Sequence, residues 1–212
     1  HICGICRRKV FSADKCSENG GLNQYRKGKI FMKLMFASDI HGSAVCLEKL
    51  LERYEAEKPE KLILLGDILY HGPRNDLPEG YAPKQVIARL NPMKKELLCV
   101  RGNCEAEVDQ MVLEFPVMAD YMTMWLDGRM VFCTHGHLFD PDNMTQLNKG
   151  DIVISGHTHI YRAEEKDGIY IINTGSVSLP KGGNPRTYVI YESGTFSVRD
   201  MDGNALKEIS LK

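Results

Sequence analysis

The chain has 212 residues, of which 43% are hydrophobic and 26% charged, a composition typical of one globular domain with a buried core. The net charge is −1, so the charge balance gives no reason to expect nucleic acid or an anionic membrane as a partner. We see no apolar stretch typical of a signal peptide or a membrane span, and therefore expect a soluble, cytoplasmic protein.

Residues 1–31 differ in composition from the remainder. They carry seven Lys and Arg against two Asp and Glu, whereas residues 32–212 carry twenty against twenty-six. They show no helical or alternating apolar period, and their three cysteines, Cys3, Cys6 and Cys16, are one ligand short of a structural zinc site. We expect a non-native or disordered leader over 1–31 and a single domain over 32–212.

From Met32 onward, short apolar runs alternate with amphipathic segments, a pattern that favours an α/β fold. The apolar runs predict strands over 33–37, 61–65, 96–100, 129–134, 151–155 and 169–173. Helices are predicted from Ser43, a suitable N-cap residue, and over 83–90 and 105–113. The Pro- and Gly-rich segment 70–83 is predicted to be a functional loop, and residues from Thr187 onward to form antiparallel strands.

Metal-competent side chains follow five of these predicted strands. They are Asp39 with His41, Asp67, Asn103, His135, and His157 with His159. Because ligands bind at the carboxyl ends of strands in open α/β sheets, we expect these seven side chains to form one cluster. In extended backbone, residues i and i+2 point to the same side, so each closely spaced pair is expected to present two ligands to one place.

The alternative is that these histidines are ordinary hydrogen-bonded residues, which is the commoner fate of a single histidine at a strand end. Four of the six histidines after Met32 fall in this pattern, however. Burying four imidazoles and two carboxylates without a metal would require an elaborate hydrogen-bond network. The pattern as a whole therefore predicts a metal site.

The ordered motifs D-x-H, G-D, G-N-x-[DE], His-Gly and G-H-T-H resemble those of the calcineurin-like metallophosphoesterases, over essentially all of 32–212. Within that family, the segments MKLMFASDIHG, HGPRNDLPEGYAP, VRGNCEAEVDQM and GSVSLPKGGNP are similar to the small bacterial YfcE-type phosphodiesterases. The resemblance implies a four-layer α/β/β/α sandwich, in which two mixed β-sheets are flanked by helices.

The resemblance also divides the ligands between two metal ions. It implies one ion on Asp39, His41, Asp67 and His159, and a second on Asp67, Asn103, His135 and His157, so that Asp67 bridges. Manganese is favoured by the resemblance, although Ni²⁺, Fe²⁺ and Zn²⁺ also suit oxygen and imidazole ligands. Such a pair would hold a bridging hydroxide for direct in-line attack on phosphorus, with Asp67, Asn103 and His135 positioning the hydroxide and the phosphate.

One position departs from the wider family, where many members have G-N-H-[DE] and the His protonates the leaving group. Here Cys104 takes that position, and a neutral thiol is a weak proton donor. The weak donor predicts a preference for substrates with good leaving groups. The same Cys occurs in the YfcE-type subgroup, and the resemblance to it implies a phosphodiesterase that acts on a small diester.

Four further residues are candidates for contacts with the substrate: His71, Arg74, Asn75 and Cys104. For the first three, a solvated loop face is the competing interpretation. His137 is left outside the metal set, because it could either orient a ligand or be hydrogen-bonded at a strand end.

The same metal site could serve a phosphomonoesterase or a nuclease, since metal ligands determine the reaction better than the substrate. The sequence has no basic stripe for long nucleic acids. A different class is a catalytically silent, protein-binding scaffold such as the metallophosphoesterase-like subunit of retromer, but that class is expected to lose ligands. The resemblance finally implies a homo-oligomer, a dimer or higher.

Overall fold

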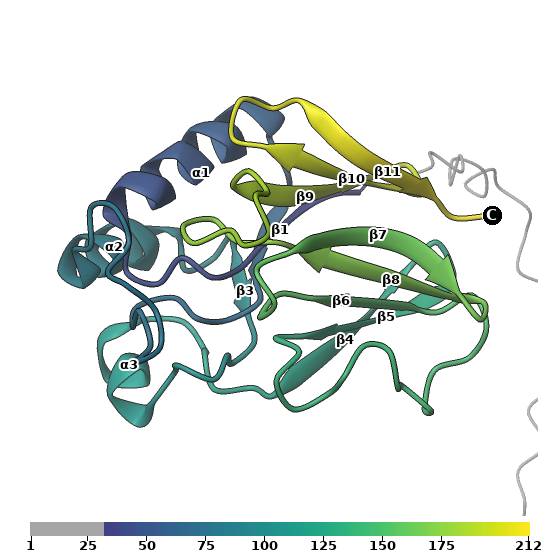
Figure 1. The fold of residues 1–212 in the computed structure, drawn as a ribbon, viewed down its shortest axis with the longest axis horizontal. Coiled ribbons are helices and arrows are strands. Elements are labelled where there is room, and N and C mark those ends of the chain that lie inside the picture. Colours follow the sequence, from purple (N-terminus) through teal and green to yellow (C-terminus); the bar gives the residue numbers. More distant parts are fainter. Residues whose placement is uncertain (1–31) are drawn as a thin grey trace, which may run out of the picture. The chain divides into compact units, whose positions relative to one another are not determined.

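The structure is a computed structural model that describes residues 32–212. The leader expected over 1–31, with its three cysteines, lies outside the described residues. Two mixed β-sheets make up most of the fold (Figure 1). The six strands of the first sheet lie in the order β11-β10-β9-β1-β2-β3. Their bounds are β1 Lys33–Ala37, β2 Lys61–Leu64, β3 Leu97–Cys99, β9 Thr187–Glu192, β10 Thr195–Asp200 and β11 Ala205–Ser210.

The second sheet has five strands in the order β4-β5-β6-β8-β7. Their bounds are β4 Tyr121–Leu126, β5 Arg129–Thr134, β6 Ile152–Ser155, β7 Tyr161–Lys166 and β8 Ile169–Thr174. In the first sheet β1, β2 and β3 run parallel at one side, and the antiparallel strands β9, β10 and β11 continue the sheet beyond β1. In the second sheet β5, β6 and β8 run parallel in the centre and the antiparallel strands β4 and β7 flank them, so both sheets are mixed, as the fold class predicted.

Alternation along the strands separates two cores. In β1, Met35 and Ala37 face α1 (Ala44–Glu57) and α2 (Pro83–Leu90), where they pack with Leu47 and Val86. Leu34 and Phe36 point the other way and belong to the core between the sheets. In Figure 1, α1 and α2 lie on one side of the first sheet and the second sheet lies on the other. The strand therefore reads as a continuous apolar run because both of its faces are buried.

The outer face of the second sheet is covered differently from the first. Phe132, Val153 and Ile171 on that face pack against Phe139 and Met144 of the irregular segment 136–150. Within residues 32–212 this fourth layer is thus formed by coil, and the helices gather around the first sheet. No helix in this part of the chain is both long and apolar enough to cross a bilayer.

Most predicted elements are present with bounds shifted by one or two residues. Ser43 caps α1 as expected, because its Oγ accepts the Cys46 N–H at 3.2 Å. The helix predicted over 105–113 is α3, Glu107–Val112, and it begins after Glu105 because the Glu105 carboxylate points into the protein. The sequence analysis missed β4 and β7, which both pair with a neighbour at an edge of the second sheet.

Candidate metal centre

The seven predicted ligand positions follow the carboxyl ends of β1, β2, β3, β5 and β6. Five of them are held in left-handed backbone, with φ of 58° at Asp39, 49° at His41, 56° at Asp67, 66° at His157 and 60° at His159. Residues with a side chain rarely adopt this region, and each costs about 1–3 kcal/mol. Tight turns of this kind place the polar side chains that follow β1, β2 and β6 within a few residues of the end of each strand.

Three side chains form a first group. The unpaired, buried Oδ1 of Asp39 lies 3.5 Å from His41 Nε2 and 3.1 Å from His159 Nε2, and these two nitrogens are 3.3 Å apart. The other carboxylate oxygen, Oδ2, is already satisfied by Ser38 Oγ at 2.5 Å and by the His157 N–H at 3.1 Å. An orphaned buried oxygen that faces two imidazole nitrogens is a site that a cation would complete.

A second group surrounds His135. Its Nε2 lies 3.2 Å from Asn103 Oδ1, 3.3 Å from His157 Nδ1 and 3.5 Å from Asp67 Oδ2. The same Asp67 oxygen is 3.6 Å from His41 Nε2 in the first group. Asp67 Oδ2 therefore lies between the two groups, in the position that a ligand shared by two ions would need.

The pair formed by His157 and His159 differs from the expectation. We expected both side chains to serve one place, but His159 joins Asp39 and His41 whereas His157 joins His135. Both residues have left-handed φ values, so the alternation of extended backbone on which that expectation rested does not apply to them.

Backbone carbonyls fix the tautomers of three imidazoles. The Nδ1 atoms of His41, His135 and His159 lie 2.8, 2.6 and 2.5 Å from the carbonyl oxygens of Tyr70, Leu65 and Leu179. A carbonyl oxygen can only accept, so Nδ1 carries the proton and the lone pair of Nε2 is free to bind a metal. All three free nitrogens point into the cluster described above.

Side chains that the sequence analysis left out support the cluster. Glu105 accepts the backbone N–H groups of Gly102, Asp67 and Ile68 at 2.5, 2.8 and 2.7 Å, and so holds the turns after β2 and β3 together. Ser176 and Ser178, from the segment after β8, donate their hydroxyls to the Asp39 carbonyl. Glu105 is the acidic residue of the G-N-x-[DE] motif, and that was the one available indication of its importance.

The charges of the cluster are mutually dependent. Burial alone would raise the pKa of Asp39, but the neighbouring imidazoles of His159 and His41 hold it well below its ordinary value. Burial likewise opposes the charged form of His135, yet its interaction with Asp67 raises the pKa of His135 to about 9. In the metal-free protein a proton on His135 therefore takes the place of a cation, and the carboxylate, amide and imidazole groups of the cluster fit divalent ions.

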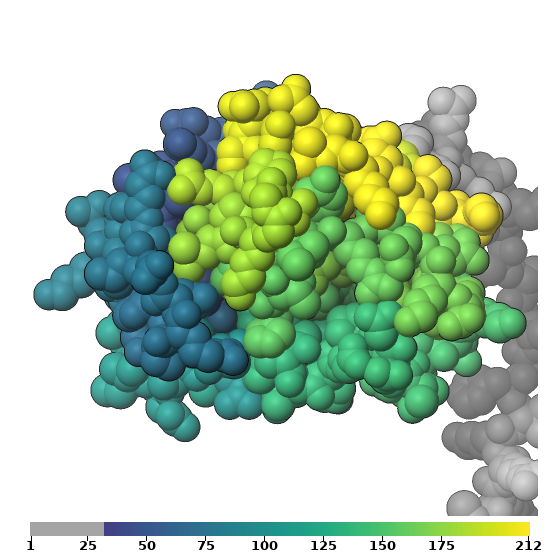
Figure 2. Space-filling model, in the orientation of Figure 1, coloured from purple at the N-terminus to yellow at the C-terminus, as the bar shows by residue number. Residues whose placement is uncertain are grey.

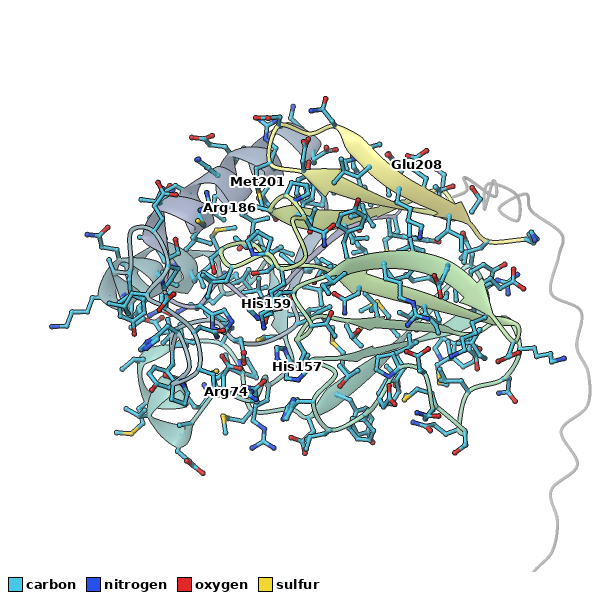
Figure 3. All side chains as sticks on the ribbon, in the orientation of Figure 1. Arg74, His157, His159, Arg186, Met201 and Glu208 are labelled. Carbon is cyan, nitrogen blue, oxygen red and sulfur yellow. The ribbon has the colours of Figure 1, made fainter. Side chains whose placement is uncertain are left out.

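Two of the four residues predicted to contact the substrate lie beside the predicted metal ligands. Arg74 and Asn75 line a cavity of about 390 Å³, together with the predicted ligands Asp67, Asn103, His157 and His159. The sequence analysis missed two residues that also line it, Thr158 and Lys181. In Figure 3 the labelled Arg74, His157 and His159 lie near one another.

Other residues near the cluster have different surroundings. The ring of His71 packs edge-on against Tyr70 and Tyr81, at centroid distances of 4.7 and 5.3 Å. The Cys104 Sγ lies within 4.8 Å of ligand atoms of His41 and Asp67, and burial together with the Asp67 charge raises the pKa of this thiol. In the metal-free protein Cys104 is therefore a neutral thiol. The Nδ1 of His137 is buried and makes no hydrogen bond within the described residues.

Comparison with known proteins places this geometry among phosphoesterases. The model of the calcineurin-like phosphoesterase superfamily domain matches residues 32–195. Phosphodiesterase YfcE of Escherichia coli strain K12 is 50% identical over 167 residues, which are 79% of this chain and 91% of that protein. The solved structure of that phosphoesterase from E. coli has a TM-score of 0.83 at 47% identity, and the match covers 85% of this chain and all of the other.

A more distant structure shares the fold alone. Vacuolar protein sorting 29 from Cryptosporidium parvum has a TM-score of 0.58 at 17% identity, with 85% of this chain and 98% of that chain covered.

Proposed function

The chain belongs to the calcineurin-like phosphoesterase superfamily and is a metal-dependent phosphoric ester hydrolase, and from this premise we propose that it is a phosphodiesterase with two divalent metal ions. The observation that carries the proposal is the position of Asp67 Oδ2, 3.6 Å from His41 Nε2 and 3.5 Å from His135 Nε2. One carboxylate oxygen between two groups of metal-competent atoms supports a bridged pair of ions.

Asp39, His41, Asp67 and His159 would hold one ion, and Asp67, Asn103, His135 and His157 the other. Oxygen and imidazole ligands without thiolate suit Mn²⁺, Ni²⁺, Fe²⁺ and Zn²⁺ alike, and we favour Mn²⁺ among them on the resemblance to the family. When bound, such ions supply positive charge for the phosphate and a water nucleophile of lowered pKa.

The protein's own groups hold this arrangement in place. The carbonyls of Tyr70, Leu65 and Leu179 keep three imidazoles in the metal-binding tautomer. Two carboxylates in the ligand set, Asp39 and Asp67, offset only half of the charge of two divalent ions, so the site retains positive charge for an anionic ester. Asn103 and His135 lie beside Asp67 and are suited to position the phosphate.

A diester is favoured over a monoester for two reasons. Cys104 stands where many family members have a His, and a thiol is a weak proton donor, so the site lacks the acid that a poor leaving group needs. The relative with 50% identity is itself named a phosphodiesterase. We do not favour a silent scaffold, because all seven ligand positions carry suitable side chains and converge.

The test is to strip the protein of metal and to add back Mn²⁺, Ni²⁺, Zn²⁺ or Mg²⁺ separately. Hydrolysis of bis(p-nitrophenyl) phosphate is then compared with that of p-nitrophenyl phosphate. We expect activity only with added metal, and a higher kcat/KM for the diester. Asp67→Asn is the control, since it keeps the shape of the side chain but removes the charge of the shared ligand. If no metal raises the activity of the unmodified chain above that of this variant on either ester, the proposal is wrong.

We also propose that residues 32–212 form the catalytic domain of a cytoplasmic homo-oligomer that does not require nucleic acid. A reducing compartment is supported by the four cysteines within residues 32–212, Cys46, Cys99, Cys104 and Cys133, which are all free thiols. Size-exclusion chromatography with light scattering measures the oligomeric state, and a monomeric mass would contradict this part of the proposal.

A further inference from the structure

Two cationic side chains line the cavity beside the predicted metal ligands. Arg74 comes from the segment after β2 and Lys181 from the segment after β8. Figure 2 shows both segments, around residues 70–81 in blue and 175–186 in yellow-green, on the same face of the molecule. Within residues 32–212 neither side chain forms an ion pair, whereas the nearby Arg186 is paired with Glu79 at 2.9 Å. Two positive charges are therefore free to bind a ligand in the cavity.

Both cationic segments are tied to the metal ligands. The segment that carries Arg74 begins at Tyr70, whose carbonyl accepts from His41 Nδ1 at 2.8 Å. The segment that carries Lys181 is held by the Leu179 carbonyl on His159 Nδ1 and by the Lys181 N–H on the His159 carbonyl at 3.0 Å. These bonds fix the backbone positions of the two cations relative to the reaction centre.

The turn around Arg74 is also fixed from within. Asn75 donates its Nδ2 to the His71 carbonyl at 2.8 Å and its backbone N–H to the Gly72 carbonyl at 3.3 Å. Arg74 is therefore presented by a hydrogen-bonded turn that lines the cavity.

The cavity is lined by polar and charged side chains. Apart from the predicted metal ligands, its lining consists of Arg74, Asn75, Thr158 and Lys181, none of which is aliphatic or aromatic. Its volume of about 390 Å³ is sufficient for a small molecule. An apolar ester group would find little surface to bury there, whereas a polar, anionic group would meet donors and positive charge.

The charge count points to more than one phosphate. The scissile diester carries one negative charge, and the metal ions already serve it. A phosphate monoester carries a charge of about −1.5 to −2 at neutral pH and three strong acceptor oxygens, which matches one Arg and one Lys better than a carboxylate does.

We propose that the substrate is a phosphodiester in which one esterified group carries a further phosphate, and that Arg74 and Lys181 bind this second phosphate. The proposal rests on the proposed phosphodiesterase function and names the substrate class of the same site. Arg74 and Lys181 then determine specificity, while the metal ligands determine the reaction.

The test uses two probes that differ only in the second phosphate. They are thymidine 5′-(p-nitrophenyl phosphate) and the same compound phosphorylated on the 3′-hydroxyl, and both release p-nitrophenol. With the full chain loaded with Mn²⁺, we expect kcat/KM to be at least about tenfold higher for the phosphorylated probe, since two charge-assisted contacts are gained. Arg74→Gln and Lys181→Gln should each lower this ratio about threefold to tenfold, and added salt should lower it further.

A matched control and a second readout separate binding from turnover. Lys207→Gln removes an exposed lysine from β11, outside the cavity, and should leave the ratio unchanged. Isothermal titration should show tighter binding of thymidine 3′,5′-bisphosphate than of thymidine 5′-phosphate, and each cavity variant should reduce the difference.

The outcomes distinguish the two proposals. If the metal-loaded chain hydrolyses bis(p-nitrophenyl) phosphate but treats both thymidine probes alike, the second-phosphate proposal is overturned and the phosphodiesterase proposal stands. The same conclusion follows if neither cavity variant lowers the ratio more than Lys207→Gln does. If the chain hydrolyses no diester with any metal, both proposals fail.

Discussion

We propose that Cys104 limits which leaving groups the site accepts. Its thiol lies within 4.8 Å of ligand atoms of His41 and Asp67, and burial raises its pKa. Replacing it with histidine would introduce a proton donor at the position where many members of the family carry one. We expect Cys104→His to raise kcat/KM on diesters and monoesters with alkyl leaving groups by at least about tenfold, since general acids contribute about 10²–10⁴-fold.

The matched control is Cys104→Ser, which keeps a small polar side chain but adds no imidazole. Rates on p-nitrophenyl esters should respond less than rates on alkyl esters, because p-nitrophenolate departs without a proton. Equal alkyl-ester rates for the histidine and serine variants would contradict the role we assign to this position.

For single residues, the sequence was sufficient to predict which side chains could bind metal. It was insufficient to predict how those side chains are oriented. Asp39, Asp67 and the histidines could be found because each follows an apolar run. The carbonyls of Tyr70, Leu65 and Leu179, which fix the tautomers, belong to backbone and leave no trace in residue identity. Lys181 could not be predicted from the sequence, because it reaches the cavity through a later loop that is hydrogen-bonded to His159.

The loop after β3 shows how tightly the connecting segments are packed. A Cβ added to Gly102 would overlap Asp67 Oδ1 and lie 2.6 Å from Asp67 N. Gly102→Ala should therefore displace the proposed bridging carboxylate. We expect at least about a tenfold loss of Mn²⁺ affinity, measured by isothermal titration, because shifts in groups that orient ligands cost about 10–100-fold.

Gly128→Ala provides the comparison, since a Cβ there meets nothing within 4 Å. Its backbone has φ +79°, so this variant should lose stability by strain but keep its metal affinity. An unchanged Mn²⁺ affinity in folded Gly102→Ala would show that the position of Asp67 tolerates more movement than we infer.

Among the elements, those with uniform apolar character were predictable. β1, β2, β5 and β6 are almost wholly buried, and their sequences are continuous apolar runs. β4 and β7 are edge strands, and β7 has the sequence YRAEEK with charged residues facing outward. This segment forms a strand because β8 supplies its hydrogen-bond partners. The pattern of apolar residues within the segment itself does not predict that pairing.

For the whole molecule, the two sheets contribute to one cluster whose stability depends on protonation. In the metal-free protein, burial lowers and Asp67 raises the pKa of His135, with a final value of about 9 against an ordinary 6.5. A histidine whose pKa is raised in the folded protein stabilises the fold fully when the pH is below its pKa in the unfolded chain. This contribution is lost as the pH rises through the pKa of the folded protein. We expect the free energy of unfolding to fall by on the order of 3 kcal/mol between pH 6.5 and 9.

With Mn²⁺ bound the trend should reverse, because a metal requires the deprotonated imidazole and its affinity rises with pH. Urea unfolding with EDTA or with excess Mn²⁺ measures both slopes, and His135→Gln should flatten the metal-free one. Parallel slopes in the two conditions would contradict a metal site built on His135.

The most direct test of the two-ion phosphodiesterase is a titration of the metal-free chain with Mn²⁺, in which bound metal and hydrolysis of bis(p-nitrophenyl) phosphate are measured on the same samples. Equilibrium dialysis with elemental analysis gives the bound metal per chain. We predict that activity rises with binding and reaches its plateau at two Mn²⁺ per chain, and that Asp67→Asn reaches neither value. A full plateau at one Mn²⁺ per chain, or full activity without metal, would contradict the account.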